Sequence, residues 1–284
     1  MLISAELVGA SHVDTLKIRA RLAFLRAERG GAHDAVITLE SIIDRLSAQC
    51  GHGAPDVMEA MNLLAYCRGQ SGDVSGAFVD FQNLEMECRR LFGDEHPDTL
   101  FARHNLAFWR GLAGYPPGAV DDLEKLSKDQ QRILGEDDPE TLATKAALAH
   151  WLNENNNHEK AVEVYRDLRD AYARTLGVYH PDAMRVRNNL ADLLGKVGDA
   201  MTAVAEFKVL LGDRRRILGH DHPETLLTRQ NLARYLGRSG QKAQAVRELE
   251  QAVVDDTRVL GADHPYTKKA SESLRYWRMQ RNGN

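Results

Sequence analysis

Five histidines share one register in the chain and are the residues best suited to metal or proton chemistry. They are His12, His96, His180, His222 and His264, separated by multiples of 42 residues. Neighbouring helices of a packed array lie ~10 Å apart, which is too far for two such imidazoles to share one metal ion. Because each of these histidines precedes a proline or, at His12, a valine, we expect residues that begin helices and no metal site.

Catalytic signatures are absent from the sequence. There is no phosphate loop, G-x-S-x-G elbow, H-E-x-x-H pair or Rossmann glycine motif. His150 and Asp192 could form an acid–base pair, but no nucleophile accompanies them. Cys50, Cys67 and Cys88 have no zinc or C-x-x-C spacing. We therefore predict no catalytic residue, no cofactor and no enzyme activity.

Charge and hydropathy exclude further classes of protein. With 37 basic and 41 acidic side chains the net charge is -4, whereas nucleic-acid-binding proteins usually carry a basic surplus. No apolar run approaches the ~18–20 residues that span a bilayer, and the N-terminal segment lacks a basic secretory region. We expect a cytoplasmic protein that binds neither nucleic acid nor membrane.

Prolines mark a strict internal repeat. Six of the eight prolines follow one another at intervals of 42 residues: Pro55, Pro97, Pro139, Pro181, Pro223 and Pro265. One step before Pro55 lies Val13, inside a segment that matches the one around Pro97 in all but the proline. We number each repeat from this residue as position 0.

Glycines keep the same register and delimit two helices in each repeat. Position 38 is glycine in all six repeats and position 17 in five, and glycine readily takes the left-handed conformation that ends a helix. Repeat four has Asn156 at position 17, and asparagine is the next most tolerant residue there. Apolar residues at helical spacing predict a first helix from position 0 and a second from about position 19 to 37.

Further positions indicate the type of repeat. Position 22 is always alanine, and positions 9 and 10 are always a leucine–alanine pair. This arrangement resembles the tetratricopeptide repeat, in which small residues let paired helices approach closely. HEAT-type repeats share the period but do not require both features. The segment from Gly219 to Leu226 and the 42-residue length resemble the kinesin-light-chain variety.

The resemblance covers residues 13 to 282 and implies an all-α, right-handed superhelical solenoid of antiparallel helix pairs. The expected repeats are 13–54, 55–96, 97–138, 139–180, 181–222 and 223–264, followed by a capping helix over 265–284 with a charged outer face. Residues 1–12 match the end of a preceding second helix. One hypothesis is therefore that the chain is the C-terminal part of a longer protein.

In the family that the repeats resemble, positions 4, 7, 8 and 11 of the first helices line a concave groove, and this spacing is one helical face. The residues predicted to contact a ligand there are Tyr66, Phe101, His104, Asn105, Phe108, His150, Arg185, Asn188, Asn189, Asp192, Gln230, Asn231 and Arg234. Asparagine amides could hold a peptide backbone, the aromatic side chains could form apolar pockets, and the arginines suit acidic groups. The alternative is that the asparagines bond neighbouring helices.

Two sets of basic residues are predicted to be structural. Position 6 is basic in five repeats (Arg19, Arg103, Lys145, Arg187 and Arg229), and we expect ion pairs between adjacent repeats there. Arg214 to Arg216 are expected to form a basic patch at the end of a second helix, where cations suit the helix dipole.

These features predict a non-catalytic scaffold that binds a protein or peptide of unknown identity in the groove. The alternative is a C-terminal sensor or regulatory arm of a larger signalling protein, such as a nucleotide-switched ATPase. Such an arm would hold an N-terminal domain of the same protein inactive. Catalysis is the third and least favoured alternative.

Overall fold

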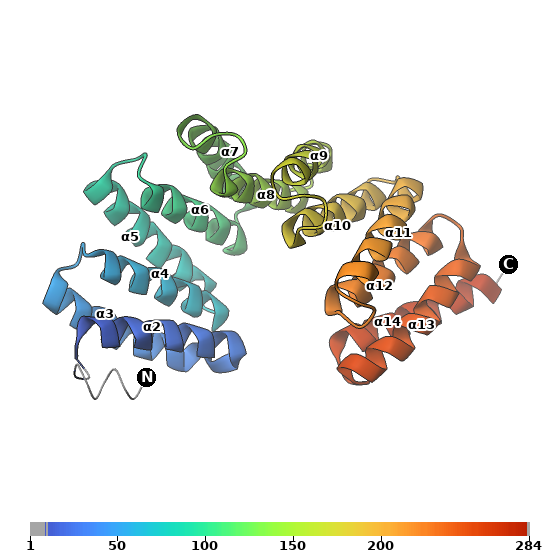
Figure 1. The fold of residues 1–284 in the computed structure, drawn as a ribbon, viewed down its shortest axis with the longest axis horizontal. Coiled ribbons are helices and arrows are strands. Elements are labelled where there is room, and N and C mark those ends of the chain that lie inside the picture. Colours follow the sequence, from blue (N-terminus) through green and yellow to red (C-terminus); the bar gives the residue numbers. More distant parts are fainter. Residues whose placement is uncertain (1–8, 10, 283–284) are drawn as a thin grey trace. The chain divides into compact units, whose positions relative to one another are not determined.

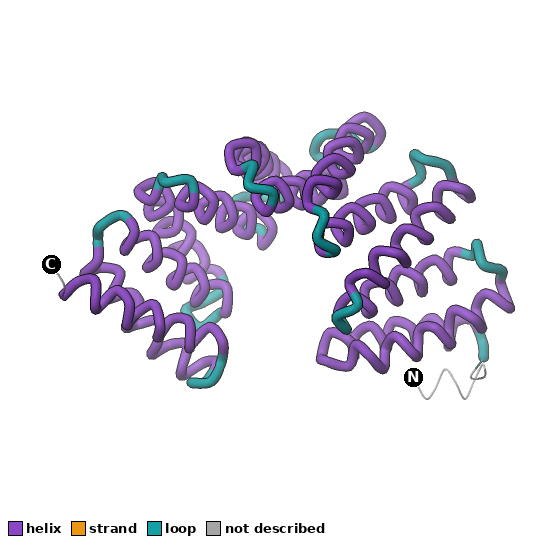
Figure 2. The backbone as a smooth tube through the Cα atoms, turned by 180° about the vertical axis from the view of Figure 1, so that it is seen from behind, coloured by secondary structure: helices purple, strands orange, loops and turns teal. Residues whose placement is uncertain are grey.

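The computed structural model describes residues 9 and 11–282, which consist of helices and short connections (Figure 1, Figure 2). The first helices are α2 (Val13–Arg26), α4 (Pro55–Gln70), α6 (Pro97–Leu112), α8 (Pro139–Glu154), α10 (Pro181–Lys196), α12 (Pro223–Arg238) and α14 (Pro265–Asn282). The second helices are α3 (Ala32–Cys50), α5 (Val74–Phe92), α7 (Pro116–Ile133), α9 (His158–Thr175), α11 (Ala200–Ile217) and α13 (Lys242–Leu260). A turn over Ala27–Gly31 (η1), in which Gly30 has φ 99°, joins α2 to α3. The predicted positions of both helices are confirmed.

The five repeated histidines begin first helices. Before α2, α6, α10 and α12, the histidine Nδ1 accepts a hydrogen bond of 3.2 or 3.3 Å from the backbone N–H two residues later. His264 accepts the same bond at 3.2 Å, and Asp138 takes the role before α8 at 2.9 Å. Such caps satisfy N–H groups that the first helical turn leaves unpaired. The predicted role in starting helices is confirmed.

The turn between the two helices of a repeat needs one left-handed residue. The glycines at position 17 have φ between 85° and 101°, and Asn156 takes their place with φ 59°. Asn156 is the one non-glycine residue with positive φ in the part of the chain that the structure describes. This agrees with the sequence-based assignment of Asn156 to the turn.

Helices pack against their neighbours in chain order, within two compact units. The first unit ends at Asn155 and the second begins at Asn156, and each is described by itself. In both, first helices of successive repeats also touch, as α2 touches α4 and α10 touches α12. The predicted inner face of α9 (Ala161, Val162, Tyr165 and Leu168) is at most 8% exposed. The predicted fold class, an all-α solenoid of antiparallel helix pairs, is confirmed.

The glycines at position 14 serve packing between repeats, a role that the sequence analysis did not assign. A Cβ atom on these glycines would lie 1.9–2.4 Å from an aromatic ring at position 12 of the next repeat. The pairs are Gly69 with Trp109, Gly111 with Trp151, Gly195 with Tyr235, and Gly237 with Trp277. We call them the glycine–aromatic pairs. In each pair the missing Cβ lets the aromatic ring of the next first helix pack directly against the backbone of the glycine.

Arginines at position 6 form a repeated ion pair. They bind the aspartate at position 32: Arg103 with Asp129 at 2.8 Å, Arg187 with Asp213 at 2.8 Å, and Arg229 with Asp255. Both partners belong to the same repeat, so the predicted pair is confirmed. For these three arginines the predicted placement between adjacent repeats is wrong, because position 6 faces the repeat's own second helix. Lys145, at the same position, does pair with the preceding repeat, at 3.6 Å from Glu136.

Arg214 corrects the prediction of a basic surface patch. Its side chain is 2% exposed, and burial lowers the pKa of its guanidinium. Nη1 donates to Thr228 Oγ1 at 2.6 Å and to the Glu224 carbonyl at 3.0 Å, and Nη2 pairs with the Glu224 carboxylate at 2.9 Å. The reason is geometric: position 33 of a second helix faces the first helix that follows it.

The structure describes the predicted C-terminal capping helix but only part of the predicted N-terminal helix end. In α14 the predicted charged outer face is exposed: Lys268, Lys269, Glu272, Arg275, Arg278 and Arg281. The predicted helix end in residues 1–12 lies outside the described residues, except for Gly9, Ser11 and His12. The repeat boundaries remain predictions.

Candidate functional site

The predicted ligand-binding residues occupy positions 4, 7, 8 and 11 of the first helices, a surface we call the first-helix face. Its exposed members are Tyr66, Phe101 and Arg185. Partly exposed are His104, Asn105, Phe108, His150, Asn188, Asn189, Asp192, Asn231 and Arg234, whereas Gln230 is buried. All but one of the predicted residues therefore reach solvent.

A pocket opens on this face between α4 and α6, and we call it the α4–α6 pocket. Its volume is about 280 Å³, and its lining is Pro55, Met58, Glu59, Asn62, Leu84, Cys88, Asp98, Phe101 and Ala102. Leu84 and Cys88, from α5, are 3% and 2% exposed, whereas Phe101 is 44% exposed. Burial raises the pKa of the Cys88 thiol to about 11, so the sulfur is a neutral, apolar part of the wall.

Acidic groups surround the α4–α6 pocket. Glu59 accepts a hydrogen bond of 2.8 Å from Arg21 of the preceding first helix. The Asp98 side chain is 65% exposed, and its nearest basic atom is His96 Nδ1 at 3.7 Å. No lysine or arginine of the described chain pairs with Asp98, so its negative charge is available at the pocket's edge.

The predicted aromatic residues do not form one continuous apolar strip. Tyr66 packs between Phe24 and Trp109, with ring centroids 5.5 and 6.1 Å away. Phe108 instead packs against Trp151 at 5.7 Å, while Phe101 lines the pocket.

His104 faces a neighbouring helix. Its Nδ1 lies 3.0 Å from Thr144 Oγ1 on α8, and burial lowers the pKa of its imidazole. His150 lies beside Phe108, with ring centroids 6.3 Å apart. Both histidines therefore contribute to packing between first helices as well as to the face.

Asparagine side chains link successive first helices at one register. Asn105 Nδ2 donates to Asn62 Oδ1 at 3.2 Å in the first unit, and Asn231 Nδ2 donates to Asn188 Oδ1 at 3.4 Å in the second. In both, position 8 of one repeat bonds position 7 of the repeat before it. This geometry supports the alternative in which the asparagines bond neighbouring helices. Each amide still keeps further donor or acceptor capacity.

In the second unit Asp192 is the centre of a polar network. Its carboxylate accepts bonds from Arg234 at 2.5 Å and from the Tyr235 hydroxyl at 2.9 Å, and it pairs with Lys196 at 3.1 Å. Arg234 also donates to Asn231 Oδ1 at 2.9 Å and lies over the Tyr235 ring. This part of the first-helix face satisfies its own charges.

Two other predicted residues of the second unit have protein partners. Gln230 is 8% exposed and donates to Asp256 Oδ2 at 2.6 Å. Its side chain therefore points into the packing between helices. The prediction that Gln230 lines the groove is wrong. Arg185 is exposed and pairs with Asp182 on its own helix at 2.7 Å. The arginines predicted to receive acidic groups already bind carboxylates.

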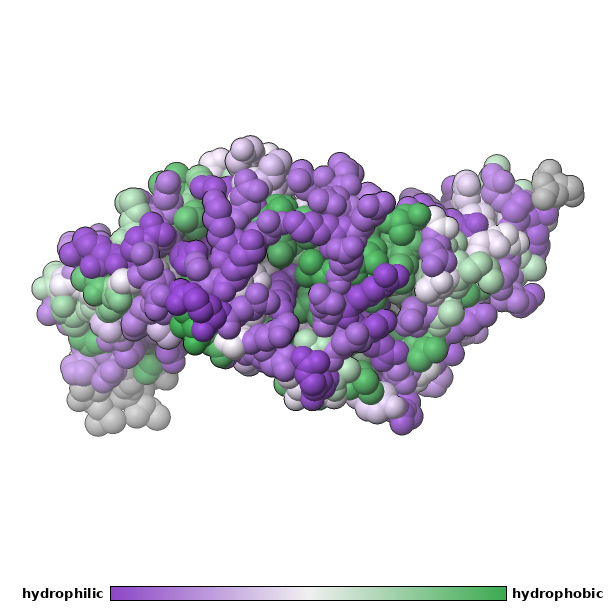
Figure 3. All heavy atoms as spheres, turned by 90° about the horizontal axis from the view of Figure 1, so that it is seen from above, coloured by the Kyte–Doolittle hydropathy of each residue, from purple (hydrophilic) through white to green (hydrophobic). Residues whose placement is uncertain are grey.

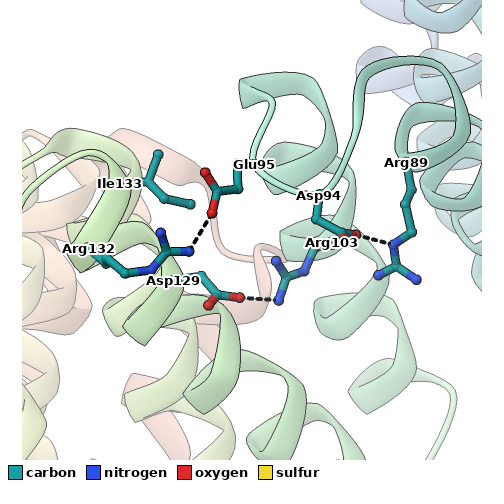
Figure 4. Close-up of a pocket in the computed structure, with 7 residues that line it drawn as sticks. All are labelled: Arg89, Asp94, Glu95, Arg103, Asp129, Arg132 and Ile133. Atoms are coloured by element: carbon teal, nitrogen blue, oxygen red, sulfur yellow. Dashed lines mark hydrogen bonds and ion pairs between the residues drawn. The ribbon is translucent and has the colours of Figure 1, made fainter.

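Sequence reasoning missed a cleft between α5, α6 and α7, shown in Figure 4. Its volume is about 470 Å³, and it is lined by Arg89, Asp94, Glu95, Arg103, Asp129, Arg132 and Ile133. The charges form pairs across it: Arg89 with Asp94 at 2.6 Å, Arg103 with Asp129 at 2.8 Å, and Arg132 with Glu95 at 2.7 Å. Because its basic groups are paired, we interpret the cleft as a link between helices and not as an anion site.

The described residues form neither a metal site nor a membrane-spanning helix. No group of three or more His, Cys, Asp or Glu side chains in them is arranged to hold a metal ion. Among those same residues, no helix combines the length and apolar character that crossing a membrane requires. Exposed apolar side chains are instead scattered over a mainly hydrophilic surface, as Figure 3 shows for one face.

Comparison with known proteins gives both family and structural matches. Two family models described as tetratricopeptide repeat match residues 141–182 and 182–253. A search of curated proteins finds no match. A solved Podosopora anserina protein, described as a putative kinesin light chain with nearly identical TPR-like repeats, is 26% identical. It has a TM-score of 0.67, and the alignment covers 73% of this chain and 97% of that one.

More distant structures share the fold. A signal-transduction ATPase from Pyrococcus horikoshii, with a tetratricopeptide-repeat sensor, is 15% identical with a TM-score of 0.64. That alignment covers 92% of this chain and 37% of the ATPase. The Rap conjugation gene regulator of plasmid pLS20, solved with the Phr* peptide, is 12% identical with a TM-score of 0.59, covering 94% and 80%. With its 42-residue register and these matches, the chain is a tetratricopeptide-repeat protein of the kinesin-light-chain-like type.

Proposed function

We propose that the chain is a non-catalytic scaffold that binds a protein or peptide segment on its first-helix face. In this proposal the α4–α6 pocket receives an apolar side chain of the partner. The observation that carries the proposal is the pocket itself, because it combines a buried apolar wall with the accessible ring of Phe101. Concave apolar sites with a few polar groups are typical ligand sites.

The polar groups around the pocket indicate the chemistry of the partner. The Asn62 Oδ1 accepts a hydrogen bond from Asn105, and the NH₂ group of Asn62 can donate to a peptide carbonyl. The exposed carboxylate of Asp98 favours a basic residue beside the apolar anchor. We therefore infer an extended segment that carries a large apolar residue next to a lysine or arginine.

The structural matches support binding in general. One protein of the same fold was solved with a peptide, and another uses such repeats as a sensor. Because both are far below 25% identity, they support the fold and leave the partner to be found.

The proposal is tested with a displayed library of random linear peptides, selected on the intact chain. We expect the selected peptides to share a large apolar residue beside a basic one. Phe101→Ala should weaken their binding by about tenfold, which corresponds to ~1.4 kcal/mol. Fluorescence anisotropy with labelled peptides measures the dissociation constants.

Leu112→Ala is the matched control, because Leu112 lies on the same helix, is 45% exposed and does not line the pocket. It should leave peptide binding unchanged. Equal affinities of the selected peptides for the parent chain and Phe101→Ala would show that the pocket is not the site.

A second candidate function is that of a sensor arm in a larger signalling protein. The distant match to the sensor of an ATPase motivates it. In that case the first-helix face would still bind a segment, and binding would alter an attached domain. Expression of the gene with its full upstream reading frame, followed by an ATP-hydrolysis assay, separates this function from that of a free scaffold.

A further inference from the structure

The α4–α6 pocket has a counterpart in repeat five, where α10, α11 and α12 take the places of α4, α5 and α6. Both places are built from proline at position 0, methionine at position 3, asparagine at position 7 and leucine at position 29. These are Pro55, Met58, Asn62 and Leu84 in the pocket, and Pro181, Met184, Asn188 and Leu210 in its counterpart. The two places therefore share a frame, and the residues that differ decide what fills it.

In repeat five an arginine side chain fills the counterpart. Arg214, at position 33, is 2% exposed. Its Nη1 donates to Thr228 Oγ1 at 2.6 Å and to the Glu224 carbonyl at 3.0 Å, and its Nη2 pairs with the Glu224 carboxylate at 2.9 Å. Glu224 and Thr228 are positions 1 and 5 of the next repeat. One guanidinium thus binds the start of the next first helix.

In repeat two the residue at position 33 leaves this space open. The residues at position 33 are at most 5% exposed in all six repeats: Leu46, Cys88, Gln130, Tyr172, Arg214 and Asp256. Cys88 is the smallest of them, and its side chain ends at Sγ. The pocket of about 280 Å³ lies between Cys88 and the start of α6, where Asp98 and Ala102 take the places of Glu224 and Thr228.

The carboxylate that receives a guanidinium in repeat five is also present in the pocket. Asp98 is at position 1, as Glu224 is, and its side chain is 65% exposed. After burial, the negative charge of Asp98 is the largest cause that raises the pKa of the Cys88 thiol to about 11. The charge of Asp98 therefore acts on the sulfur that stands where repeat five has its arginine. Position 4 changes in the same direction, since Glu59 replaces Arg185.

We propose that the α4–α6 pocket binds the guanidinium of an arginine in the partner segment, in the place that Arg214 occupies in repeat five. The guanidinium donates to the carboxylate and carbonyl of Asp98, and the apolar neighbour of the arginine lies on Phe101. A lysine ammonium presents its donors from a single nitrogen and does not span both acceptors as a planar guanidinium does. This inference rests on the proposed function, because it names the basic residue of the segment that is bound there.

The binding test uses short probes of defined chemistry. N-acetyl-Leu-Arg-amide and N-acetyl-Arg-Leu-amide are compared with the same dipeptides carrying lysine or citrulline in place of arginine. Citrulline keeps the shape of arginine and lacks its charge. Each titration is followed in NMR spectra by the methyl signal of Met58, which lines the pocket. We expect at least one arginine probe to bind, and its lysine and citrulline analogues to bind at least about fivefold more weakly, because they lose charge-assisted bonds.

Two variants and a matched control locate the site. Asp98→Asn should bind the arginine probe at least about fivefold more weakly. Cys88→Arg should not bind it, because the new side chain fills the pocket. Asp14→Asn is the control: Asp14 has the same position 1 on α2, its side chain is 72% exposed, and it does not line the pocket. It should bind the probe as tightly as the parent chain does.

A second measurement needs no ligand. The double variant Cys88→Arg/Ala102→Thr copies the residues of repeat five into the pocket. Asp98→Asn should lower the melting temperature of this double variant by at least about 2 °C more than that of the parent chain, because it removes the partner of the new guanidinium. Circular dichroism measures both shifts. Asp98→Asn alone changes an exposed side chain, so the binding test is decisive even where the double variant does not fold.

Three outcomes would overturn the proposal: equal binding of the arginine, lysine and citrulline probes, an Asp98→Asn variant that binds the arginine probe as tightly as the parent chain, or no binding of either arginine probe. The proposed function can fail separately. An arginine probe that binds Phe101→Ala as tightly as the parent chain would refute the apolar anchor and leave the guanidinium site intact. If Phe101→Ala weakens every probe while Asp98→Asn weakens none, the proposed function stands and the arginine inference fails.

Discussion

In the first unit, the first-helix face carries the exposed ring of Phe101 over an apolar pocket. In the second unit, the same face carries Asp192, which binds Arg234, Tyr235 and Lys196. One surface leaves apolar area and a carboxylate available to a partner, and the other satisfies its own charges. Since desolvating a paired charge is costly, the proposed function places the ligand on the first unit.

The two faces rest on the same internal arrangement. Both units have an asparagine bond between positions 8 and 7 of successive repeats, and both have the ion pair between positions 6 and 32. Both also contain glycine–aromatic pairs. The repeat therefore fixes helix placement with a few recurring contacts, while the remaining face positions differ between repeats. The difference in surface chemistry arises without any change of scaffold.

The largest expected effect concerns this shared arrangement. Gly111→Ala places a Cβ 2.4 Å from the Trp151 ring, and Gly195→Ala places one 2.1 Å from the Tyr235 ring. Both rings are buried, so each substitution should lower the free energy of unfolding by ~2–3 kcal/mol through overpacking. Urea denaturation followed by circular dichroism measures the loss. Similar losses in both units would confirm that the scaffold is the same.

Compensating substitutions at the ring sharpen this test. Trp151→Leu should restore most of the stability lost in Gly111→Ala, because the smaller side chain makes room for the Cβ. Tyr235→Leu should restore less in Gly195→Ala, because it also removes the hydroxyl that donates to Asp192. If both restore stability equally, the bond from the Tyr235 hydroxyl to Asp192 contributes nothing measurable.

A smaller effect separates the two faces directly. Asp192→Ala should lower the free energy of unfolding by ~1–2 kcal/mol, because it leaves Arg234 and Lys196 without their carboxylate, while the Tyr235 hydroxyl keeps its bond to the backbone carbonyl of residue 192. Phe101→Ala should change it by less than about 1 kcal/mol, since the ring is largely exposed and makes no comparable bonds. Thermal and urea unfolding of both variants measures the contrast. Equal losses would mean that both faces mainly stabilise the fold.

Sequence reasoning located the helices because their ends depend on local chemistry. Proline at position 0, histidine before it and glycine at position 17 each act on the backbone within a few residues. The same reasoning found Asn156 as a substitute for glycine. Position 14 was not interpreted, because its cause is a ring in the next repeat. Reading position 14 against position 12 one repeat later would have revealed the match of glycine with Trp or Tyr.

The candidate site was less predictable. Helical spacing indicates which side of a helix a residue lies on, but it does not show whether the neighbouring helices bury that side chain. Gln230 shares the spacing of the first-helix face but turns inward to Asp256. The α4–α6 pocket depends on how far apart two helices lie and on the size of Cys88 at its wall. Arg214 lies in a run of three arginines that resembles a surface patch, yet Thr228 and Glu224 of the next first helix bind it.

The smallest expected effect is a pH dependence at position 7, which is His104 on α6 in the first unit and Asn188 on α10 in the second. Burial lowers the pKa of His104 below its ordinary value of 6.5, so folding favours the neutral ring. The unfolded chain therefore binds the proton more readily, and the stability due to this residue is complete above pH 6.5 and is lost as the pH falls through the folded-state pKa. Native-state hydrogen exchange between about pH 7.5 and 5.5 follows the opening of α6 and α10 separately. His104→Asn should remove part of the acid destabilisation of α6 and leave α10 unchanged; a profile of α6 that His104→Asn does not alter would mean that other groups cause it.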